Sequence, residues 1–452
     1  MIILKKNILF LVLDSFPAEK CYGKNKTSIT PNIDSMINKG VNFTQTITCS
    51  DGTELGWASI FTALYPFKTG LNNIELSKLS PDVTSYIKIL KDNGYHPYAI
   101  MPKVSSLFGV TKDFENEDLN YESDERIYNG LGQKILNKIQ LKELKEPWIY
   151  FIHLLDLHVP LSLPKKFNDH KFGNNQYERM VSAIDDWIGK ILNEIKLENT
   201  IVVLTSDHGE YIHETDLINS DFSRNSLSKI VWKIDSITPS FLGSVKNQSY
   251  DGIRKISRKI KSRKIQNLSP YQKRSLLNSR SDPEGYLYDE IVHVPLIMIG
   301  GELKPKIISQ QVRHVDIFPT LTDLVECTID NDVIHGESLL PLLNDSKLDE
   351  KPAYIEGTIR MKKTAEAVVG IRTPKFKYFR SRDNNIRKRH LYNLENDPLE
   401  EHNIINNNPD IVKEMEQILI SIQRDDKITK NQVMDDEESK QVEEELSKLG
   451  YI

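Results

Sequence analysis

Several features that mark secreted, membrane-spanning or nucleic-acid-binding proteins are scarce or missing in this sequence. Among 452 residues there are only three cysteines, Cys21, Cys49 and Cys327, an odd number set far apart. They predict neither a disulfide framework nor a zinc cluster, and they favour a reducing compartment. No apolar run approaches the roughly 18 residues that span a bilayer. The short N-terminal apolar run ends in an acid and has no small-residue cleavage site, so we expect a soluble, cytoplasmic protein.

A strong excess of one charge is also missing, because the formal net charge is only -5. Hydrophobic residues make up 39% of the chain and charged residues 27%, which is typical of a globular enzyme with a substantial core. Basic residues gather in one place, where residues 251–280 hold ten Lys or Arg against a single acid. This stretch lies in an insertion at about 211–287.

The basic insertion has two interpretations. It is either a solvated helix face, or a lid that attracts an anionic substrate or makes membrane-surface contact with acidic lipids. No aromatic stacking platform accompanies the basic residues, so no nucleic acid partner is expected.

Short, continuous apolar runs predict buried parallel strands, and they occur at NILFLVLD, PWIYFIHLLD, NTIVVLTSD and HVPLIMIG. Between them, TPNIDSMINKG, SYIKILKDNG and ERMVSAIDDWIGKILNEIK carry apolar residues at helical spacing. This alternation predicts an α/β fold with a mostly parallel sheet. After about residue 345 the chain changes to strand-like AEAVVGIRT and KFKYFRS. We therefore expect a catalytic domain over residues 1–345 and a C-terminal subdomain over 346–452.

Three of the predicted strands end in polar residues. Asp14 ends the first, Asp156 and His158 follow the second, and Asp207 and His208 follow the third. Ligands of open parallel sheets bind at the carboxyl ends of the strands, so these side chains can meet in space. Carboxylate oxygens and imidazole nitrogens are ligands of divalent cations. The pattern therefore predicts a metal site formed by Asp14, Asp207 and His208.

Motifs along nearly the whole chain outside the insertion resemble those of sulfatase-like proteins of the alkaline phosphatase superfamily. In chain order they are NILFLVLDSF, TPNID, GVNFT, FIHLLDLHVP, VLTSDHGE, LYDEIVHVPLIMIG, VRHVDIFPTLTDLV, HGESLLPLL and HLYNLENDPLEEHNI. The resemblance implies an alkaline-phosphatase-like sandwich, with a mostly parallel central sheet, helices on both faces and a small C-terminal α+β subdomain. It also implies one divalent metal ion, with Ca, Mg, Mn and Zn as candidates. The implied substrate is an anionic small molecule or a glycan or lipid ester.

The nucleophile position departs from the family pattern. Sulfatases resemble one another around C-x-P-S-R or S-x-P-x-R before a helix, and counting back from ASIFTALYP puts Thr53 in the Cys or Ser position and Trp57 in the arginine position. Threonine cannot become formylglycine, and CSDGT at Cys49 lacks the required proline and arginine. A threonine hydroxyl is instead the nucleophile in phosphodiesterases and phosphotransferases of the same superfamily.

An alcohol is a weak nucleophile, and metal coordination activates it. We therefore predict that Thr53 is both nucleophile and metal ligand, and that the reaction passes through a covalent intermediate. The alternative role of Thr53 is a helix N-cap, and both roles can coexist.

Four further residues follow from the resemblance. His158 matches an active-site histidine that bonds a substrate oxygen or protonates the leaving group, and its alternative role is structural. Lys103 lies one position from a catalytic lysine, and His213, after the DHGE turn, is a substrate-binding candidate. Ser15 stands where many sulfatases have a second metal-binding Asp.

These residues leave several functions open. The first is hydrolysis of phosphate or sulfate esters through Thr53. The alternatives are a sulfuric ester hydrolase of the arylsulfatase type without formylglycine, a phosphoethanolamine- or phosphoglycerol-type transferase, and an inactive binding member of the family.

Overall fold

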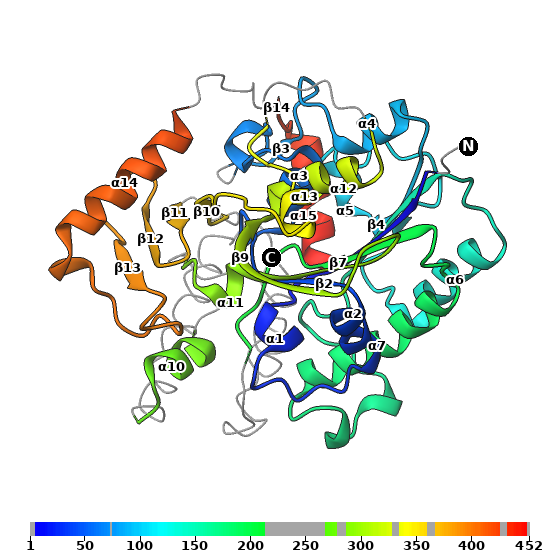
Figure 1. Ribbon diagram of the computed structural model, residues 1–452, viewed down its shortest axis with the longest axis horizontal. Coiled ribbons are helices and arrows are strands. Elements are labelled where there is room, and N and C mark those ends of the chain that lie inside the picture. The colour runs from blue at the N-terminus through cyan, green and yellow to red at the C-terminus, as the bar shows by residue number, and fades with distance from the viewer. Residues whose placement is uncertain are drawn as a thin grey trace, which may run out of the picture.

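The computed structural model describes residues 5–72, 75–212, 267–277, 286–327, 334–358, 367–424 and 432–449. Within these ranges an eight-stranded sheet lies between two layers of helices, with α1, α2 and α7 on one face and α3, α5, α12 and α15 on the other (Figure 1). The sheet has the order β5-β4-β6-β1-β7-β8-β2-β9. Its strands are β1 Asn7–Leu13, β2 Val41–Ile47, β4 His96–Pro102, β5 Asn120–Tyr121, β6 Trp148–Leu154, β7 Thr200–Thr205, β8 His293–Gly300 and β9 Lys306–Arg313. This sandwich confirms the predicted fold class.

The helices that accompany the large sheet are α1 Ala18–Tyr22, α2 Pro31–Lys39, α3 Thr53–Thr62, α4 Tyr86–Asp92, α5 Val104–Leu107, α6 Gly132–Gln140, α7 Gln176–Asn193, α11 Asp289–Val292, α12 Ile317–Leu324 and α13 Leu340–Leu343. Of these, α2, α4 and α7 match the three amphipathic segments predicted from the sequence. A further short helix, α10, spans Pro270–Leu277. None of the helices in the described part of the chain is long and apolar enough to cross a membrane.

The direction of one strand differs from the prediction. HVPLIMIG forms β8, but it runs antiparallel to both of its neighbours, β7 and β2. The other pairs of the large sheet are parallel. A strand that is buried on both faces reads as a continuous apolar run in either direction, so the run predicts burial and leaves the direction open.

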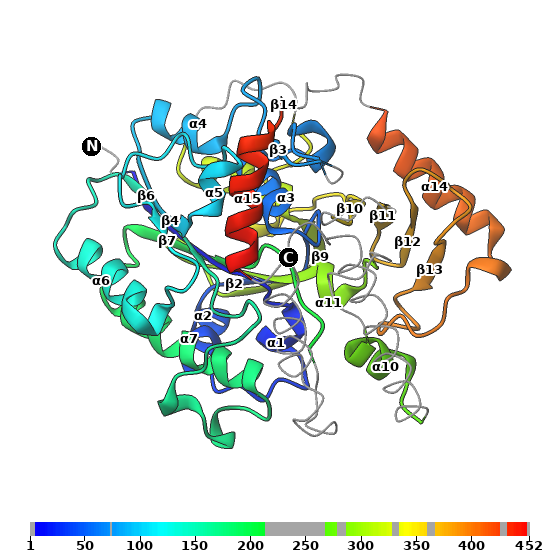
Figure 2. The same cartoon turned by 180° about the vertical axis from the view of Figure 1, so that it is seen from behind.

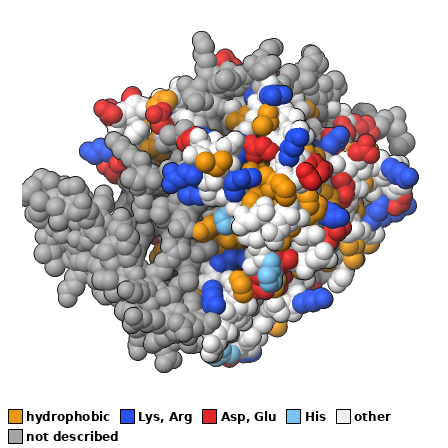
Figure 3. Space-filling view, turned by 90° about the vertical axis from the view of Figure 1, so that its left-hand side faces the viewer, with side chains coloured by type: hydrophobic (Ala, Val, Ile, Leu, Met, Phe, Trp, Pro, Cys, Tyr) orange, Lys and Arg blue, Asp and Glu red, His pale blue; other side chains and the backbone are white. Residues whose placement is uncertain are grey.

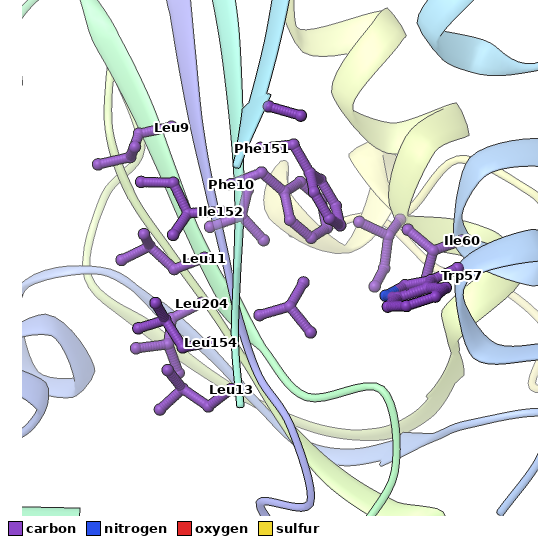
Figure 4. Close-up of a cluster of buried hydrophobic side chains, with 14 of the residues drawn as sticks. Leu9, Phe10, Leu11, Leu13, Trp57, Ile60, Phe151, Ile152, Leu154 and Leu204 are labelled. Carbon is purple, nitrogen blue, oxygen red and sulfur yellow. The ribbon is translucent and has the colours of Figure 1, made fainter. Parts of the chain in front are cut away.

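The central strands show why the sheet needs a helical layer on each face. Figure 4 shows Leu9, Leu11 and Leu13 on one side of β1 and Phe10 on the other, as expected for side chains that alternate along a strand. Phe10 stacks on Phe151 with ring centroids 5.1 Å apart. Both faces of the strand are therefore apolar, and only the strand ends are left for polar chemistry.

A second sheet lies beside the first and is antiparallel, with the order β10-β11-β12-β13. Its strands are β10 Ala353–Glu356, β11 Val368–Arg372, β12 Phe376–Ser381 and β13 His390–Asn393, and helix α14 Pro409–Gln423 packs on it. A shared apolar cluster joins it to the large sheet's body through Cys49, Tyr65 and Val315. The loop that leads to α3 is thus part of this contact.

The last helix, α15 Asp436–Lys448, lies with the large sheet rather than with the second one. Figure 2 shows it beside α3 and α5. The short strand before it, β14 Gln432–Val433, pairs with β3 Ser77–Lys78. The division of the chain at residue 345 places this helix with the C-terminal subdomain. Its packing groups it with the first 345 residues instead, because its apolar stripe contacts that body.

The surface of the described residues carries both signs of charge. Figure 3 shows Lys, Arg, Asp and Glu side chains intermixed on one face, with apolar side chains between them. The basic run at 251–266 lies outside the described residues, so both interpretations of the insertion stay predictions.

A buried ionic network joins the second sheet to α11. Lys377, at 0% exposure, contacts the carboxylates of Asp289 and Glu400, with its Nζ 2.8 Å from the Glu400 oxygen. Arg372 holds the same Asp289 with two hydrogen bonds of 3.0 and 2.8 Å. Buried charges are tolerated only when paired, so removing one partner leaves the remaining charges buried without compensation.

We expect Lys377→Met to lower the free energy of unfolding by about 3 kcal/mol or more, because Asp289 and Glu400 lose their shared cation inside the protein. Chemical denaturation measures this loss. Lys375→Met is the matched control, since Lys375 is 54% exposed and pairs with the equally exposed Glu395 at 3.5 Å. An exposed pair contributes at most about 1 kcal/mol. Equal losses in the two variants would contradict the assignment.

Candidate active site

Three of the predicted site residues meet at the carboxyl edge of the large sheet. Asp14 follows β1, and Asp207 and His208 follow β7, its parallel neighbour. All three side chains are 0% exposed. The His208 Nε2 atom lies 3.5 Å from an oxygen of Asp14 and 3.5 Å from an oxygen of Asp207.

Thr53 joins this cluster from the start of α3. Its Oγ1 atom lies 3.1 Å from His208 Nε2 and 3.2 Å from Asp14 Oδ1. Gly52 occupies the N-cap position and Thr53 is the first helical residue, so the N-cap role considered for Thr53 is wrong. The hydroxyl faces the cluster, and the positive end of the α3 dipole lies behind it.

The loop after β1 holds both carboxylates in place. Ser15 has a positive φ of 61°, which is uncommon for a residue other than glycine. Its backbone N–H donates to Asp207 Oδ1 at 3.2 Å, and its hydroxyl donates to Asp14 Oδ2 at 3.1 Å. Tyr177 donates to the Ser15 carbonyl at 2.7 Å and fixes the turn. Ser15 therefore positions the two carboxylates where the family pattern has a third.

Two glycines allow the backbone to close around Asp207 and His208. A Cβ atom on Gly56 of α3 would lie 3.2 Å from the Asp207 carbonyl oxygen, so the bare glycine permits this approach. A Cβ atom on Gly209 would lie 2.0 Å from the Glu290 carbonyl oxygen, and the Gly209 N–H donates to Ile291 at 2.7 Å. The SDHGE turn is thus locked to α11.

The proton position on His208 follows from its other ring nitrogen. Nδ1 lies 2.9 Å from the carbonyl oxygen of Gly209, which can only accept a hydrogen bond. The proton is therefore on Nδ1, and Nε2 presents a lone pair to Thr53, Asp14 and Asp207. A carbonyl that fixes the tautomer in this way is the usual support of a metal-binding histidine.

A second histidine lies at the cluster, and it was not predicted from the sequence as a site residue. His153, the sixth residue of β6, places its Nε2 atom 4.0 Å from Asp207 Oδ2. The indole N–H of Trp57 donates to its Nδ1 atom at 2.9 Å. Burial lowers the pKa of His153 to about 4. The available signal was a polar residue inside an otherwise apolar strand, which a core histidine would also give.

Two other predicted residues have different surroundings. His158 is 5% exposed and follows β6, and its backbone N–H donates to Leu155 at 2.9 Å. Lys103 is 48% exposed and pairs with Glu122 at 3.2 Å and with Glu445 of α15 at 3.8 Å. It thus lies among acidic surface groups, unlike the buried cluster around Thr53. The catalytic roles of both residues stay predictions, and His213 lies outside the described residues.

Asp156, two residues before His158, has a separate role in the backbone. Its Oδ1 atom accepts the Ile127 N–H at 3.0 Å, and burial raises its pKa to about 7. It fixes the segment at Ile127 beside the end of β6.

The donor types at the cluster fit a divalent cation. Asp14 and Asp207 supply carboxylate oxygens, His208 an imidazole lone pair and Thr53 an alcohol oxygen, which together suit a hard or borderline ion. Two neighbouring carboxylates at 0% exposure also repel each other, and a cation between them would offset that repulsion. The interatomic distances of 3.1 to 3.5 Å are close to those between ligands that share one ion.

An α/β sandwich with a carboxylate pair, an imidazole and an alcohol at the carboxyl edge of its sheet is typical of the alkaline phosphatase superfamily. Comparison with known families makes this specific. The Sulfatase family model matches residues 6–327, and the model described as N-sulphoglucosamine sulphohydrolase, C-terminal, matches residues 283–427. The chain belongs to the sulfatase family.

Relatives and solved structures agree with this assignment. Arylsulfatase K of Gallus gallus is 23% identical over 456 residues, which cover 92% of this chain and 82% of that protein. The phosphonate monoester hydrolase of Agrobacterium radiobacter has a TM-score of 0.63 at 16% identity, covering 93% of this chain and 96% of its own. A protein solved in complex with its substrate D-glucosamine-2-N,6-O-disulfate has a TM-score of 0.61 at 18% identity, covering 93% and 99%. At these identities the structural likeness shows the fold.

Proposed function

We propose that the protein hydrolyses sulfate or phosphate esters with a divalent cation, and that the Thr53 hydroxyl is the nucleophile. The observation that carries this proposal is the position of Thr53 Oγ1, 3.1 Å from His208 Nε2 and 3.2 Å from Asp14 Oδ1. An alcohol within hydrogen-bond reach of a base, next to carboxylates that suit a cation, is the arrangement of an activated nucleophile. A divalent ion held by Asp14, Asp207 and His208 would lower the pKa of the alcohol and polarise the ester.

Each bond that forms or breaks during hydrolysis can be assigned to a residue of the chain or to water. Thr53 Oγ1 attacks the sulfur or phosphorus atom, its proton passes to the Asp14 carboxylate that faces it at 3.2 Å, and the bond to the leaving alcohol breaks. His158, in the loop after β6, supplies the proton of that alcohol. Water next attacks the covalent ester on Thr53 and releases sulfate or phosphate. The net change is ester plus water to alcohol plus anion.

A sugar-linked ester is the substrate class that the comparisons support. The solved relative described above holds a sulfated glucosamine as its substrate, and the family model for the C-terminal part is that of a sulphohydrolase of N-sulphoglucosamine. We therefore propose an anionic ester on a glycan as the substrate.

The threonine itself favours a second candidate, a phosphodiester hydrolase. Sulfate monoesters and phosphodiesters both carry one negative charge, whereas a phosphate monoester approaches two because its second pKa is about 6. A single divalent ion only neutralises the two carboxylates Asp14 and Asp207. A dianionic substrate would therefore bring two unbalanced negative charges into the cluster, whereas a monoanionic one brings only one.

We expect purified protein, tested with Mg²⁺, Mn²⁺, Ca²⁺ and Zn²⁺ in turn, to prefer an aryl sulfate or a bis-aryl phosphate over an aryl phosphate. The expected ratio of kcat/KM is at least about tenfold, equal to about 1.4 kcal/mol. Steady-state assays with these three substrates measure it, and the preferred substrate separates the two candidates. A phosphate monoester as the best substrate would contradict the charge argument. Inactivity on all three, without bound metal, would favour a binding member of the family.

A further inference from the structure

Two histidines direct Nε2 at the same carboxylate, yet their rings carry the proton on opposite nitrogens. His208 and His153 have Nε2 atoms 3.5 and 4.0 Å from Asp207 Oδ2. The Nδ1 atom of His208 faces a carbonyl oxygen, so it is protonated. The Nδ1 atom of His153 faces the indole N–H of Trp57 at 2.9 Å, and an indole nitrogen can only donate. The proton of neutral His153 is therefore on Nε2.

This tautomer excludes His153 as a metal ligand, although its distances would allow it. Asp14, His153 and Asp207 offer ligand atoms within 4.8 Å of one another. An Nε2 atom that carries a proton has no lone pair for a cation. If the proton moved to Nδ1 and so freed the Nε2 lone pair, two donors, Nδ1–H and the indole N–H of Trp57, would face each other. Of the two histidines, only His208 is built as a ligand.

The Nε2–H of His153 is instead a donor that awaits an acceptor. It is 0% exposed, and among the described residues it has no hydrogen-bond partner. A distance of 4.0 Å to Asp207 is too long for a hydrogen bond. A buried unpaired donor costs about 1–3 kcal/mol, so such groups in native proteins call for an explanation. An oxygen lying between His153 and the cation site would supply the acceptor and separate the N–H from the ion.

We propose that His153 Nε2–H binds a non-bridging oxygen of the sulfuryl or phosphoryl group, and that Trp57 is the positioning residue that fixes this tautomer. The identity of the anion rests on the proposed function, while the donor role rests on the Trp57–His153 bond. The ring pair meets edge to face, with centroids 5.1 Å apart, so packing also holds the imidazole. Trp57 stands in the arginine position of the sulfatase motif. In place of the charged guanidinium of that arginine, the chain therefore offers the neutral Nε2–H of His153, which Trp57 holds in position.

The tautomer is tested first, without turnover. In protein labelled with ¹⁵N-histidine, we expect one resonance pair with a protonated Nε2 and a bare Nδ1, which disappears in His153→Gln. It should keep this form when a divalent ion is added. In Trp57→Phe, Nδ1 loses its hydrogen-bond donor and the pair should shift. Trp148→Phe, which removes an indole at the start of the His153 strand β6, should leave the pair unchanged. A protonated Nδ1, or a change of tautomer on adding the ion, would overturn the proposal.

Binding separates a donor from a ligand. Calorimetry with inorganic sulfate on the ion-loaded protein should show a Kd raised about tenfold or more by His153→Leu and less by His153→Gln, which keeps an N–H near Nε2. The affinity for the ion should stay within about threefold in both variants. A large loss of ion affinity would make His153 a ligand, and unchanged sulfate binding would make it structural. Both measurements also work in Thr53→Ala, so failure of the hydrolysis proposal leaves this test intact.

Discussion

Thr53→Ala is expected to lower kcat/KM by at least about 1,000-fold, because the substitution removes the only atom of the side chain that can form the covalent ester. Thr53→Ser keeps the oxygen and should retain activity within about 30-fold. The remaining decrease in the activity of Thr53→Ser is expected because serine lacks the β-branch that restricts the threonine rotamer. Steady-state kinetics on the best substrate measure both effects.

The control for Thr53→Ala is Thr62→Ala at the other end of the same helix. Thr62 donates to the Ala58 carbonyl at 2.7 Å and is 1% exposed. Its removal should lower stability while leaving kcat/KM within about threefold. Acid quenching during turnover, followed by peptide mass spectrometry, should place the sulfuryl or phosphoryl group on Thr53. Activity of Thr53→Ala within tenfold of the unsubstituted protein would show that another group attacks.

The sequence was sufficient to predict that Asp14 and Asp207 lie close together, and the reason is physical. Asp14 and Asp207 each follow an apolar strand that is buried on both faces, and such strands lie at the centre of a parallel sheet. Their carboxyl ends must then lie side by side, as the pairing of β1 with β7 shows. The position of Thr53 could be predicted only with the family motif, because Thr53 begins helix α3 and does not follow a strand of the sheet.

Features that depend on lateral contacts were not predictable from local patterns. His153 sits in a strand whose other side chains are apolar, and only the Trp57 indole on a separate helix gives its ring a role. The apolar run of β8 likewise does not reveal its direction, because that direction is set by pairing with β7 and β2. Lys377 reads as a surface lysine in KFKYFRS, yet carboxylates from two distant segments bury it. In each case at least one deciding partner, such as Trp57 for His153, Asp289 for Lys377 or β7 for β8, lies roughly 90 or more residues away, beyond any periodic signal.

Asp207→Asn should abolish most of the response to divalent cations and lower kcat/KM by about 100-fold or more. A neutral amide removes one of the two charges that hold the ion, and loss of one carboxylate ligand weakens a cation site strongly. In the unsubstituted protein, an ion at 100 times its Kd should stabilise the fold by about 2.7 kcal/mol. Asp207→Asn should lose this gain, which thermal unfolding with and without the ion measures.

The sign of the effect without added ion separates a cation site from an ordinary structural carboxylate. Asp14 and Asp207 are both buried and share the surroundings of His208 Nε2, so without a cation their like charges repel. Asp207→Asn removes that repulsion, and the metal-free variant should unfold at a temperature equal to or above that of the metal-free unsubstituted protein. Asp185→Asn is the matched control, because Asp185 accepts the Ile33 N–H at 2.8 Å and is 1% exposed. It should lower stability without the ion and keep the full ion-dependent gain. If Asp207→Asn behaves like Asp185→Asn in both measurements, Asp207 serves the fold alone and the cation must bind elsewhere.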